Sequence, residues 1–398
     1  MSNIHTIEER DPSPNLVNLY PICIDHGSGS WLWDTQGRAY LDFLAGYCAC
    51  SLGHGHAGMV QAISEQAARL ALVPRVFDHS GLTPYLNHLT RFSGYEKAVL
   101  MNSGAEAVET AIKAARRWAY RVKGIVEQQA EIICFTDNFH GRTLGMISMS
   151  ATTSARDDFG PLMSGFRLVD YGDLEATAAA VSPNTCAILV EPVQGRGGVV
   201  FPPDGFLRGL RELCDANQIL LLCDEVQSGM GRTGYRFAHE VEGIRADGVA
   251  LGKSLSAGFY PISAFLADRA LLDVFTPGSH GSTFGGNALA CAIAEAALSE
   301  LENQSLIERA RTLGNRVLSQ LAGMDRFPVR AIRARGLWFA LEIDPAAGKA
   351  RTYCERLIEA GLLCDATAGN SIRFSPPLTV SEEELDRAFA ILNAVLKE

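Results

Sequence analysis

The sequence lacks an excess of basic residues, a long apolar run and any tract of biased composition. Its 35 Lys and Arg residues are outnumbered by 45 Asp and Glu residues, which gives a formal net charge of −10. Because nucleic acids and anionic membranes are bound through clustered cations, this balance argues against both as partners. No stretch reaches the roughly eighteen consecutive apolar residues of a membrane span, and the polar terminus from Met1 to Pro14 has no signal-peptide core.

Paired cysteines are also scarce. The ten cysteines are scattered as singles apart from Cys48 and Cys50, and no CxxC pair occurs. Several lie inside apolar runs, such as Cys134 and Cys223, where a free thiol behaves as a small hydrophobic group. We therefore expect buried, reduced thiols in a cytoplasmic protein, with no disulfides and no metal site.

Short apolar runs alternate with amphipathic helical patterns through the middle of the chain. Continuous apolar runs are typical of strands in a sheet covered on both faces. Their alternation with helices predicts an α/β domain with a mostly parallel central sheet covered by helices. The predicted strands are 98–101, 132–135, 186–190, 219–224, 248–251 and 262–266, and the helices between them include 105–122 and 204–216.

The two ends of the chain differ from the middle and predict a smaller α+β domain. A hairpin is expected over 30–44, and two long helices are expected after Asn287. Further strands are predicted at 329–333, 337–343 and 372–375, with helices at 349–360 and from 381 onward. We expect residues 56–285 to form the large domain, and residues 1–55 and 286–398 to form the small one.

Lys253 is the first candidate for chemistry. The run Gly252-Lys253-Ser254 resembles the end of a phosphate-binding P-loop, but that motif requires a glycine where this chain has Asp247. Most lone lysines are solvated surface charges. Lys253 instead follows an apolar strand, and apolar surroundings lower the pKa of an amine and free it as a nucleophile. That chemistry suits a Schiff base with a carbonyl cofactor.

Asp224 ends the apolar run 219–223, at the carboxyl end of a buried strand, where α/β sheets place their ligand sites. A carboxylate there could hold a cofactor ring nitrogen protonated, since an ion pair at ~4 Å is worth roughly 4 kcal/mol at an effective dielectric of ~20. The structural alternative is an aspartate that caps the next helix. Because Lys253 ends a neighbouring strand candidate, the functional interpretation is favoured.

Two further strand ends carry weaker signals. Ser103 and Gly104 join a strand to a long helix, where free amides and the helix dipole attract phosphate, although a cap alone is common. Phe139 could stack on a flat ring, and Arg142 could clamp a carboxylate with two hydrogen bonds. A core aromatic and a surface arginine are the alternative, and the residues by themselves do not decide between the two.

Together these segments resemble the class III (ω-) aminotransferases of pyridoxal-phosphate fold type I. Within that family they look most like ornithine and acetylornithine aminotransferases. The resemblance spans about Trp31 to Pro377. The motifs that carry it, in order, are 40–47, 102–106, 139–144, 191–195, 224–227 with 231–234, 251–253, 280–287 and 372–377. Eight motifs in register are specific for the family and much less specific for the substrate.

The resemblance implies pyridoxal 5′-phosphate as cofactor, held as a Schiff base on Lys253 with its ring nitrogen paired to Asp224. The remaining implied cofactor contacts are Ser103, Gly104 and Ala105 for the phosphate, Phe139 and Val226 for the ring faces, Gln227 for the ring hydroxyl, and Thr283 for the phosphate of a neighbouring subunit. A homodimer with shared active sites is therefore implied as the minimal active unit.

The resemblance also implies substrate contacts. Arg142, with Tyr47 beside it, would bind a substrate carboxylate, and Arg373 would bind the α-carboxylate of the glutamate/2-oxoglutarate pair. The implied reaction is transamination of an ω-amino or diamino acid, with 2-oxoglutarate or pyruvate as amino acceptor. Another reaction of the fold, such as that of an aminomutase or a decarboxylase, and a different amine donor are the alternatives.

Two candidate substrate-binding residues depart from the family pattern. Arg196 follows Glu191-Pro192-Val193-Gln194-Gly195, where relatives usually carry a glutamate that masks the arginine matching Arg373. Because a cation cannot mask a cation, either Arg196 turns to solvent and leaves Arg373 open, or both bind a doubly charged acid. We hypothesise weaker δ-selectivity or a different substrate. Asp78 stands where ornithine enzymes tend to have an aromatic, and it could meet a cationic substrate group or be a solvated loop residue.

Overall fold

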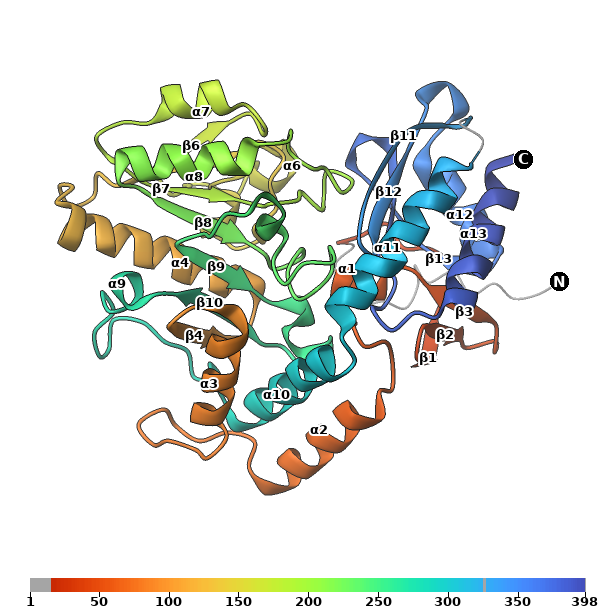
Figure 1. Cartoon of the computed structure of the whole chain (residues 1–398), viewed down its shortest axis with the longest axis horizontal. Helices are drawn as coiled ribbons and strands as arrows, with labels where there is room; N and C mark the ends of the chain where they lie inside the picture. Colours follow the sequence, from red (N-terminus) through yellow and green to blue (C-terminus); the bar gives the residue numbers. More distant parts are fainter. Residues whose placement is uncertain (1–15, 325–326, 398) are drawn as a thin grey trace.

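A computed structural model of the chain describes residues 16–324 and 327–397. Its largest sheet has seven strands in the order β4-β10-β9-β8-β7-β5-β6 (Figure 1). Strand β10 is antiparallel to both of its neighbours, and the other strands share one direction. The strands are β4 (Lys97–Met101), β5 (Glu131–Phe135), β6 (Phe166–Val169), β7 (Thr185–Val190), β8 (Leu220–Asp224), β9 (Gly248–Leu251) and β10 (Ser263–Ala267).

Helices cover both faces of this sheet, as the continuous apolar runs predict. Ile132 and Cys134 of β5 pack in the same cluster as the buried side of α4 (Gly104–Trp118). Ile133 and Phe135 point to the opposite face and pack with α8 (Phe206–Asn217). Because successive side chains of a strand point to opposite faces, such a strand is apolar throughout only when both faces are covered.

The remaining strands form two smaller sheets, β1-β2-β3-β13 and β11-β12-β15-β14. Strand β3 near the amino terminus pairs in parallel with β13 near the carboxyl terminus, which joins the two ends of the chain (Figure 1). The strands are β1 (Ile24–Ser28), β2 (Trp31–Asp34), β3 (Ala39–Asp42), β11 (Val329–Arg335), β12 (Trp338–Ile343), β13 (Leu362–Leu363), β14 (Asp365–Thr367) and β15 (Ser371–Phe374).

Helices connect and flank these sheets. The longer ones are α2 (Ala57–Arg69), α3 (Leu82–Ser93), α10 (Ala288–Asn303), α11 (Leu306–Ala322), α12 (Ala350–Glu359) and α13 (Glu382–Lys397). The short ones are α1 (Ala45–Cys48), α5 (Leu144–Ile147), α6 (Thr153–Arg156), α7 (Leu174–Ala180) and α9 (Arg269–Leu272). None of the helices in the described ranges is long and apolar enough to cross a bilayer.

The predicted elements recur with small shifts at their ends. The fold class is confirmed, because the mostly parallel seven-stranded sheet lies between helices and is accompanied by smaller sheets. Four strands were not predicted, namely β1, β6, β13 and β14. The domain boundaries beside residues 56 and 286 stay a prediction, and residues 1–15, 325–326 and 398 of the small domain lie outside the described residues.

Candidate active site

The site lies where strands of the large sheet end. Strands β4, β5, β7, β8 and β9 run in one direction, so the residues that follow them meet at one edge of the sheet. A cavity of about 180 Å³ at this edge is lined by Gly104, Ala105, Phe139, His140, Gly141, Glu191, Val193, Asp224, Val226, Gln227, Ser228 and Lys253. The sequence-predicted cofactor residues other than Ser103 and Thr283 are therefore brought together here.

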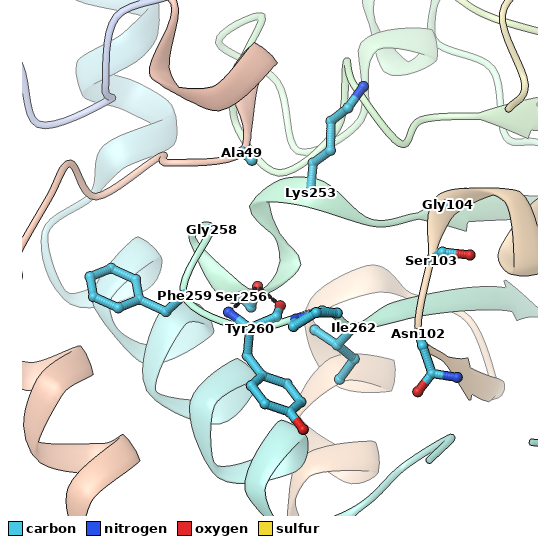
Figure 2. Close-up of a pocket in the computed structure, with 11 residues that line it drawn as sticks. Ala49, Asn102, Ser103, Gly104, Lys253, Ser256, Gly258, Phe259, Tyr260 and Ile262 are labelled. Carbon is cyan, nitrogen blue, oxygen red and sulfur yellow. Dashed lines mark hydrogen bonds between the residues drawn. The ribbon is translucent and has the colours of Figure 1, made fainter. Parts of the chain in front are cut away.

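Lys253 begins the 3-10 turn η4 (Lys253–Ser256) directly after β9. Its backbone φ of 41° lies in the left-handed region, which is costly for a residue with a side chain and is common at functional sites. Figure 2 shows its side chain pointing away from Ser256 and Tyr260, with Ser103 and Gly104 on the neighbouring wall. Burial lowers the pKa of Lys253, and the nearby Asp224 carboxylate offsets only part of that effect. A lowered pKa favours the neutral, nucleophilic form of the amine.

Asp224 is only 5% exposed, and both of its oxygens are engaged. Its Oδ1 accepts a hydrogen bond from the amide of Val226 at 3.0 Å, and its Oδ2 lies 2.7 Å from Nδ1 of His140. Burial disfavours the His140 cation, but the hydrogen bond and attraction to Asp224 outweigh burial and raise the pKa of His140. These two hydrogen bonds therefore fix the Asp224 carboxylate at the end of β8.

Glu191 is a second buried acid beside this pair. Burial raises its pKa to about 7, with Asp224 adding to the rise and His140 opposing it. One of its oxygens accepts a hydrogen bond from the amide of Phe139 at 2.9 Å. Glu191 therefore ties the loop that carries Phe139 to the end of β7.

The segment before α4 offers hydrogen-bond donors to an anion. Ser103 caps the helix, because its Oγ accepts from the amide of Glu106 at 3.3 Å while Glu106 accepts from the amide of Ser103 at 2.8 Å. The amides of Gly104 and Ala105 lie in the first turn, where a helix has no internal acceptor for them. A Cβ on Gly104 would stand 2.7 Å from Cγ1 of Val226, so only glycine allows this close packing.

These groups fit pyridoxal phosphate by their chemistry. The cavity combines an amine for an aldehyde, a buried carboxylate for a protonated ring nitrogen, and amide donors for a phosphate. Phe139 and Val226 add an aromatic and an aliphatic surface for a flat ring. Gln227 completes the lining, and its Nε2 also makes a long hydrogen bond to the carbonyl of Tyr47 at 3.4 Å.

Two arginines stand over the ring of Phe139. The guanidinium carbons of Arg142 and Arg196 lie 5.3 and 5.4 Å from the centre of its ring. Burial and the neighbouring Arg142 lower the pKa of Arg196. Within residues 16–324 and 327–397, neither arginine makes an ion pair with an acidic side chain. Arg196 does not simply turn to solvent, because it packs on Phe139 beside Arg142.

Arg373 lies in β15 and is nearly buried at 7% exposure. Its Nη2 is 3.7 Å from Oδ2 of Asp365, and Nη1 makes a 3.5 Å hydrogen bond to the carbonyl of Gly195. Arg373 therefore has an acidic partner in Asp365, so the first of the two alternatives, an open Arg373 with Arg196 turned to solvent, is wrong. Asp365 has no motif around it, and only the pairing of β14 with β15 places it opposite Arg373.

Tyr47 packs against Arg373, with 4.9 Å between the guanidinium carbon and the centre of the ring. It belongs to α1, in which Ala45, Gly46, Tyr47 and Cys48 have φ values of 42°, 56°, 58° and 74°. Left-handed conformations cost a residue with a side chain about 1–2 kcal/mol each. The surrounding structure therefore maintains an unfavourable turn that presents Tyr47 to the site.

Two predicted site residues lie away from the Lys253 cavity. Asp78 is exposed and borders another cavity of about 350 Å³ with Gln66 and Arg69, and Arg75 Nη1 lies 4.0 Å from its Oδ1. Thr283 is exposed in the loop before α10. Their predicted roles stay predictions. Among the residues that the structure describes, no group of three or more His, Cys, Asp or Glu side chains is placed to hold a metal ion.

Comparison with known proteins identifies the class to which this fold and site belong. The family model for class III aminotransferases matches residues 13–396. The chain is 50% identical over 375 residues to an ornithine aminotransferase of Bordetella pertussis, covering 94% of this chain and 91% of that protein. It is 46% identical over 377 residues to ornithine aminotransferase 2 of Staphylococcus aureus, covering 95% and 94% of the two chains.

Solved structures of ornithine and acetylornithine aminotransferases are also similar to this chain. A Toxoplasma gondii ornithine aminotransferase, described with pyridoxal phosphate at partial occupancy in its active site, superposes with a TM-score of 0.95 at 40% identity, covering 98% of this chain and 92% of that one. An acetylornithine aminotransferase of Elizabethkingia anophelis gives a TM-score of 0.86 at 39% identity, with 97% and 96% covered. The chain belongs to the class III aminotransferases, and it is an enzyme that carries out transamination with pyridoxal phosphate.

Proposed function

We propose that this aminotransferase takes the terminal amino group of ornithine, or of an acetylornithine-like diamino acid, and passes it to a dicarboxylic keto acid such as 2-oxoglutarate. The donor is supported by the relatives at 46–50% identity, which are named ornithine aminotransferases. The observation that carries the acceptor is a set of arginines next to the Lys253 cavity: Arg142 and Arg196 stack over Phe139, and Arg373 packs against Tyr47. Two separate cationic sites suit two carboxylates better than the single one of pyruvate.

Lys253, Asp224 and the start of α4 are proposed to hold the cofactor. When bound, pyridoxal phosphate supplies an aldehyde that bonds to amines and a ring that accepts the electrons left when a proton departs. Asp224 would keep the ring nitrogen protonated, and His140 would hold the Asp224 side chain in place. Ser103, Gly104 and Ala105 would bind the phosphate, Gln227 the ring hydroxyl, and Phe139 and Val226 the ring faces.

Lys253 is proposed as the base. Its lowered pKa would favour the neutral amine, so that Nζ could take a proton from the substrate carbon that bears the reacting amine. Arg373 would bind a carboxylate near the reacting carbon, and Arg142 with Arg196 would bind a distal one, with Tyr47 beside Arg373. These contacts orient the substrate so that its proton faces Lys253.

A homodimer with shared sites is proposed as the active assembly. Thr283 is exposed, and its neighbour Phe284 is 50% exposed. Val76 and Phe77 are 85% and 64% exposed on a loop that is joined to the same region, since His79 Nε2 lies 2.8 Å from the carbonyl of Gly286. Such an apolar patch suits contact with a second copy, in which Thr283 would complete the phosphate site.

A cytoplasmic location is proposed from the cysteines. All ten are free thiols, and eight of them are buried. Unpaired thiols are typical of reducing compartments.

A donor screen tests the proposed function. Ornithine, N-acetylornithine and 4-aminobutyrate would each be supplied with 2-oxoglutarate or with pyruvate, and the amino acid products would be measured. We expect the ornithine and 2-oxoglutarate pair to give the highest kcat/KM. Turnover with pyruvate but not 2-oxoglutarate, or with neither diamino acid, would contradict the proposal.

A further inference from the structure

The Arg373 guanidinium has hydrogen-bonding capacity that the described residues do not use. Its Nε lacks a hydrogen-bond partner within that part of the chain, and its bond to the carbonyl of Gly195 is long at 3.5 Å. Its only acidic neighbour there, Asp365, stands 3.7 Å away, beyond ordinary hydrogen-bond length. A buried guanidinium with five N–H donors and so few partners is suited to receive an anion.

Asp365 is fixed next to Arg373 by its strand and by two phenols. Asp365 in β14 lies directly opposite Arg373 in β15. Its Oδ1 accepts a hydrogen bond from the hydroxyl of Tyr20 at 3.3 Å, and its Oδ2 accepts one from Tyr47 at 3.4 Å. Burial and the charge of Asp365 raise the pKa of Tyr47, so both phenols stay protonated and act as donors.

The cluster of Asp365, Arg373, Tyr20 and Tyr47 borders the reaction site. Arg373 is close enough to Lys253 to lower its pKa, and it bonds the carbonyl that precedes Arg196. Tyr47 packs against the guanidinium and its carbonyl accepts from Gln227 of the cofactor cavity. Asp365 is therefore linked through Tyr47 and Arg373 to the groups that would hold cofactor and substrate.

We infer that Asp365 is a specificity-determining residue, the resident counter-ion with which a substrate carboxylate must compete for Arg373. The inference rests on the proposed function, which has Arg373 bind carboxylates. A ligand with one carboxylate gains little at Arg373 because Asp365 already neutralises it, and it is held instead at Arg142 and Arg196. A dicarboxylate, anchored there by one end, brings its second carboxylate to Arg373 and displaces the long ion pair with Asp365.

This arrangement assigns the two halves of the reaction. A diamino acid would lie with its carboxylate at the Arg142 and Arg196 pair and its terminal amine toward Lys253, because the Asp365 carboxylate already compensates the charge of Arg373. Glutamate would use both cationic sites and present its α-amine. In substrates with a single carboxylate, Asp365 thereby favours reaction of the terminal amine over reaction of the α-amine.

Binding of a non-reactive dicarboxylate tests the inference. Glutarate would be titrated into the holoenzyme by calorimetry for the native chain, Asp365→Asn and Asp25→Asn. Asp25 is exposed and lies in hydrogen-bond contact with His26, away from the site. Asp25→Asn is therefore a control that removes the same charge at a distant position. Removing the competing carboxylate should lower the Kd of glutarate roughly tenfold in Asp365→Asn and leave Asp25→Asn unchanged. An equal Kd in all three proteins would overturn the inference.

Kinetics and a second variant guard against a merely structural effect. In Asp365→Asn we expect KM for glutamate to fall and the ratio of ornithine to glutamate kcat/KM to drop about tenfold. Tyr20→Phe keeps the charge and removes one tether, so it should move glutarate binding in the same direction by roughly twofold to threefold. If Asp365→Asn fails to fold, an unchanged Kd in Tyr20→Phe counts against the inference.

The two hypotheses fail in different ways. Absence of turnover with any diamino acid would refute the proposed donor, while the glutarate comparison would still report on Asp365 and Arg373. Normal turnover of ornithine with glutarate binding unaffected by Asp365→Asn would refute the role of Asp365 alone.

Discussion

The cofactor side and the substrate side of the site are built differently. On the proposed cofactor side, Asp224, His140 and Glu191 are buried, and the hydrogen bonds of their side chains are 2.7–3.0 Å long. On the proposed substrate side, Arg142 and Arg196 stack over the ring of Phe139, and the ion pair of Arg373 is 3.7 Å long. The chemistry is thus organised before substrate arrives, while the recognition charges are left for a ligand to satisfy.

This difference separates two kinds of substitution. A change beneath the cofactor should slow every substrate alike, because it alters a step that all of them share. A change among the arginines should alter the ranking of substrates, because each substrate uses these charges differently.

Asp224→Asn should have the largest effect among the binding-site substitutions. The amide keeps the size of the side chain but loses the charge that would hold the ring nitrogen protonated, an interaction of about 4 kcal/mol at an effective dielectric of ~20. We expect kcat to fall about a thousandfold for every donor in steady-state assays. Asp170→Asn is a matched control, since Asp170 follows β6 on the same sheet edge and lies outside the cavity lining. A fall in kcat of less than tenfold would contradict this role.

His140→Gln should change stability in a pH-dependent way. The pKa of His140 is raised in the folded protein, so the ion pair contributes fully below the ordinary value of about 6.5 and is lost as pH rises through the raised pKa. We expect the native chain to exceed the variant by about 2 kcal/mol in unfolding free energy at about pH 6 and by much less at about pH 9. Chemical denaturation at both pH values measures this, and a difference that does not depend on pH would refute the charged pair.

Arg196→Glu should change the order of substrates rather than the rate of the shared step. The substitution would remove one of the two cations over Phe139 and place a carboxylate beside the other, Arg142, and near Arg373. We expect the ratio of kcat/KM for ornithine to that for glutamate to change about tenfold. Arg196→Gln separates loss of the cation from gain of the acid. Unchanged relative rates in both variants would contradict a role for Arg196 in substrate binding.

Asp78→Asn should have the smallest effect. Asp78 is exposed, and its ion pair with Arg75 is at the limit of contact at 4.0 Å. If a second copy does not bring Asp78 to the site, KM for diamines should change less than about twofold. A larger rise in KM for diamines, with KM for glutamate unchanged, would instead establish Asp78 as a contact for a cationic group.

The strands and the principal motifs were predictable because they depend on local sequence. Lys253 and Asp224 each follow a continuous apolar run, so their places at one sheet edge follow from the fold class. Strands β13 and β14 are only two and three residues long, and Cys364 lies between them. Such short strands show no detectable alternation of apolar and polar residues. Their existence depends on pairing with β3 and β15, which lie far away in the sequence or across a turn.

The site residues that were missed are those defined by their partners. Asp365 becomes notable only through the register of β14 with β15. His140 stands beside Phe139 in a motif that was noticed, and a histidine after a strand end was a usable signal, but its bond to Asp224 joins two separate strand ends. Glu191 was likewise seen as part of a motif, while its raised pKa comes from burial that the sequence does not reveal.

The central claim is that Lys253 carries the cofactor. Borohydride reduction of the holoenzyme, followed by proteolysis and mass spectrometry, locates the lysine that is covalently joined to pyridoxal phosphate. For the native chain we predict a single modified peptide, and that peptide contains Lys253. In Lys253→Ala we predict that the modification is lost and that kcat falls roughly ten-thousandfold or more. Modification of another lysine, or none in an active preparation, would contradict the claim.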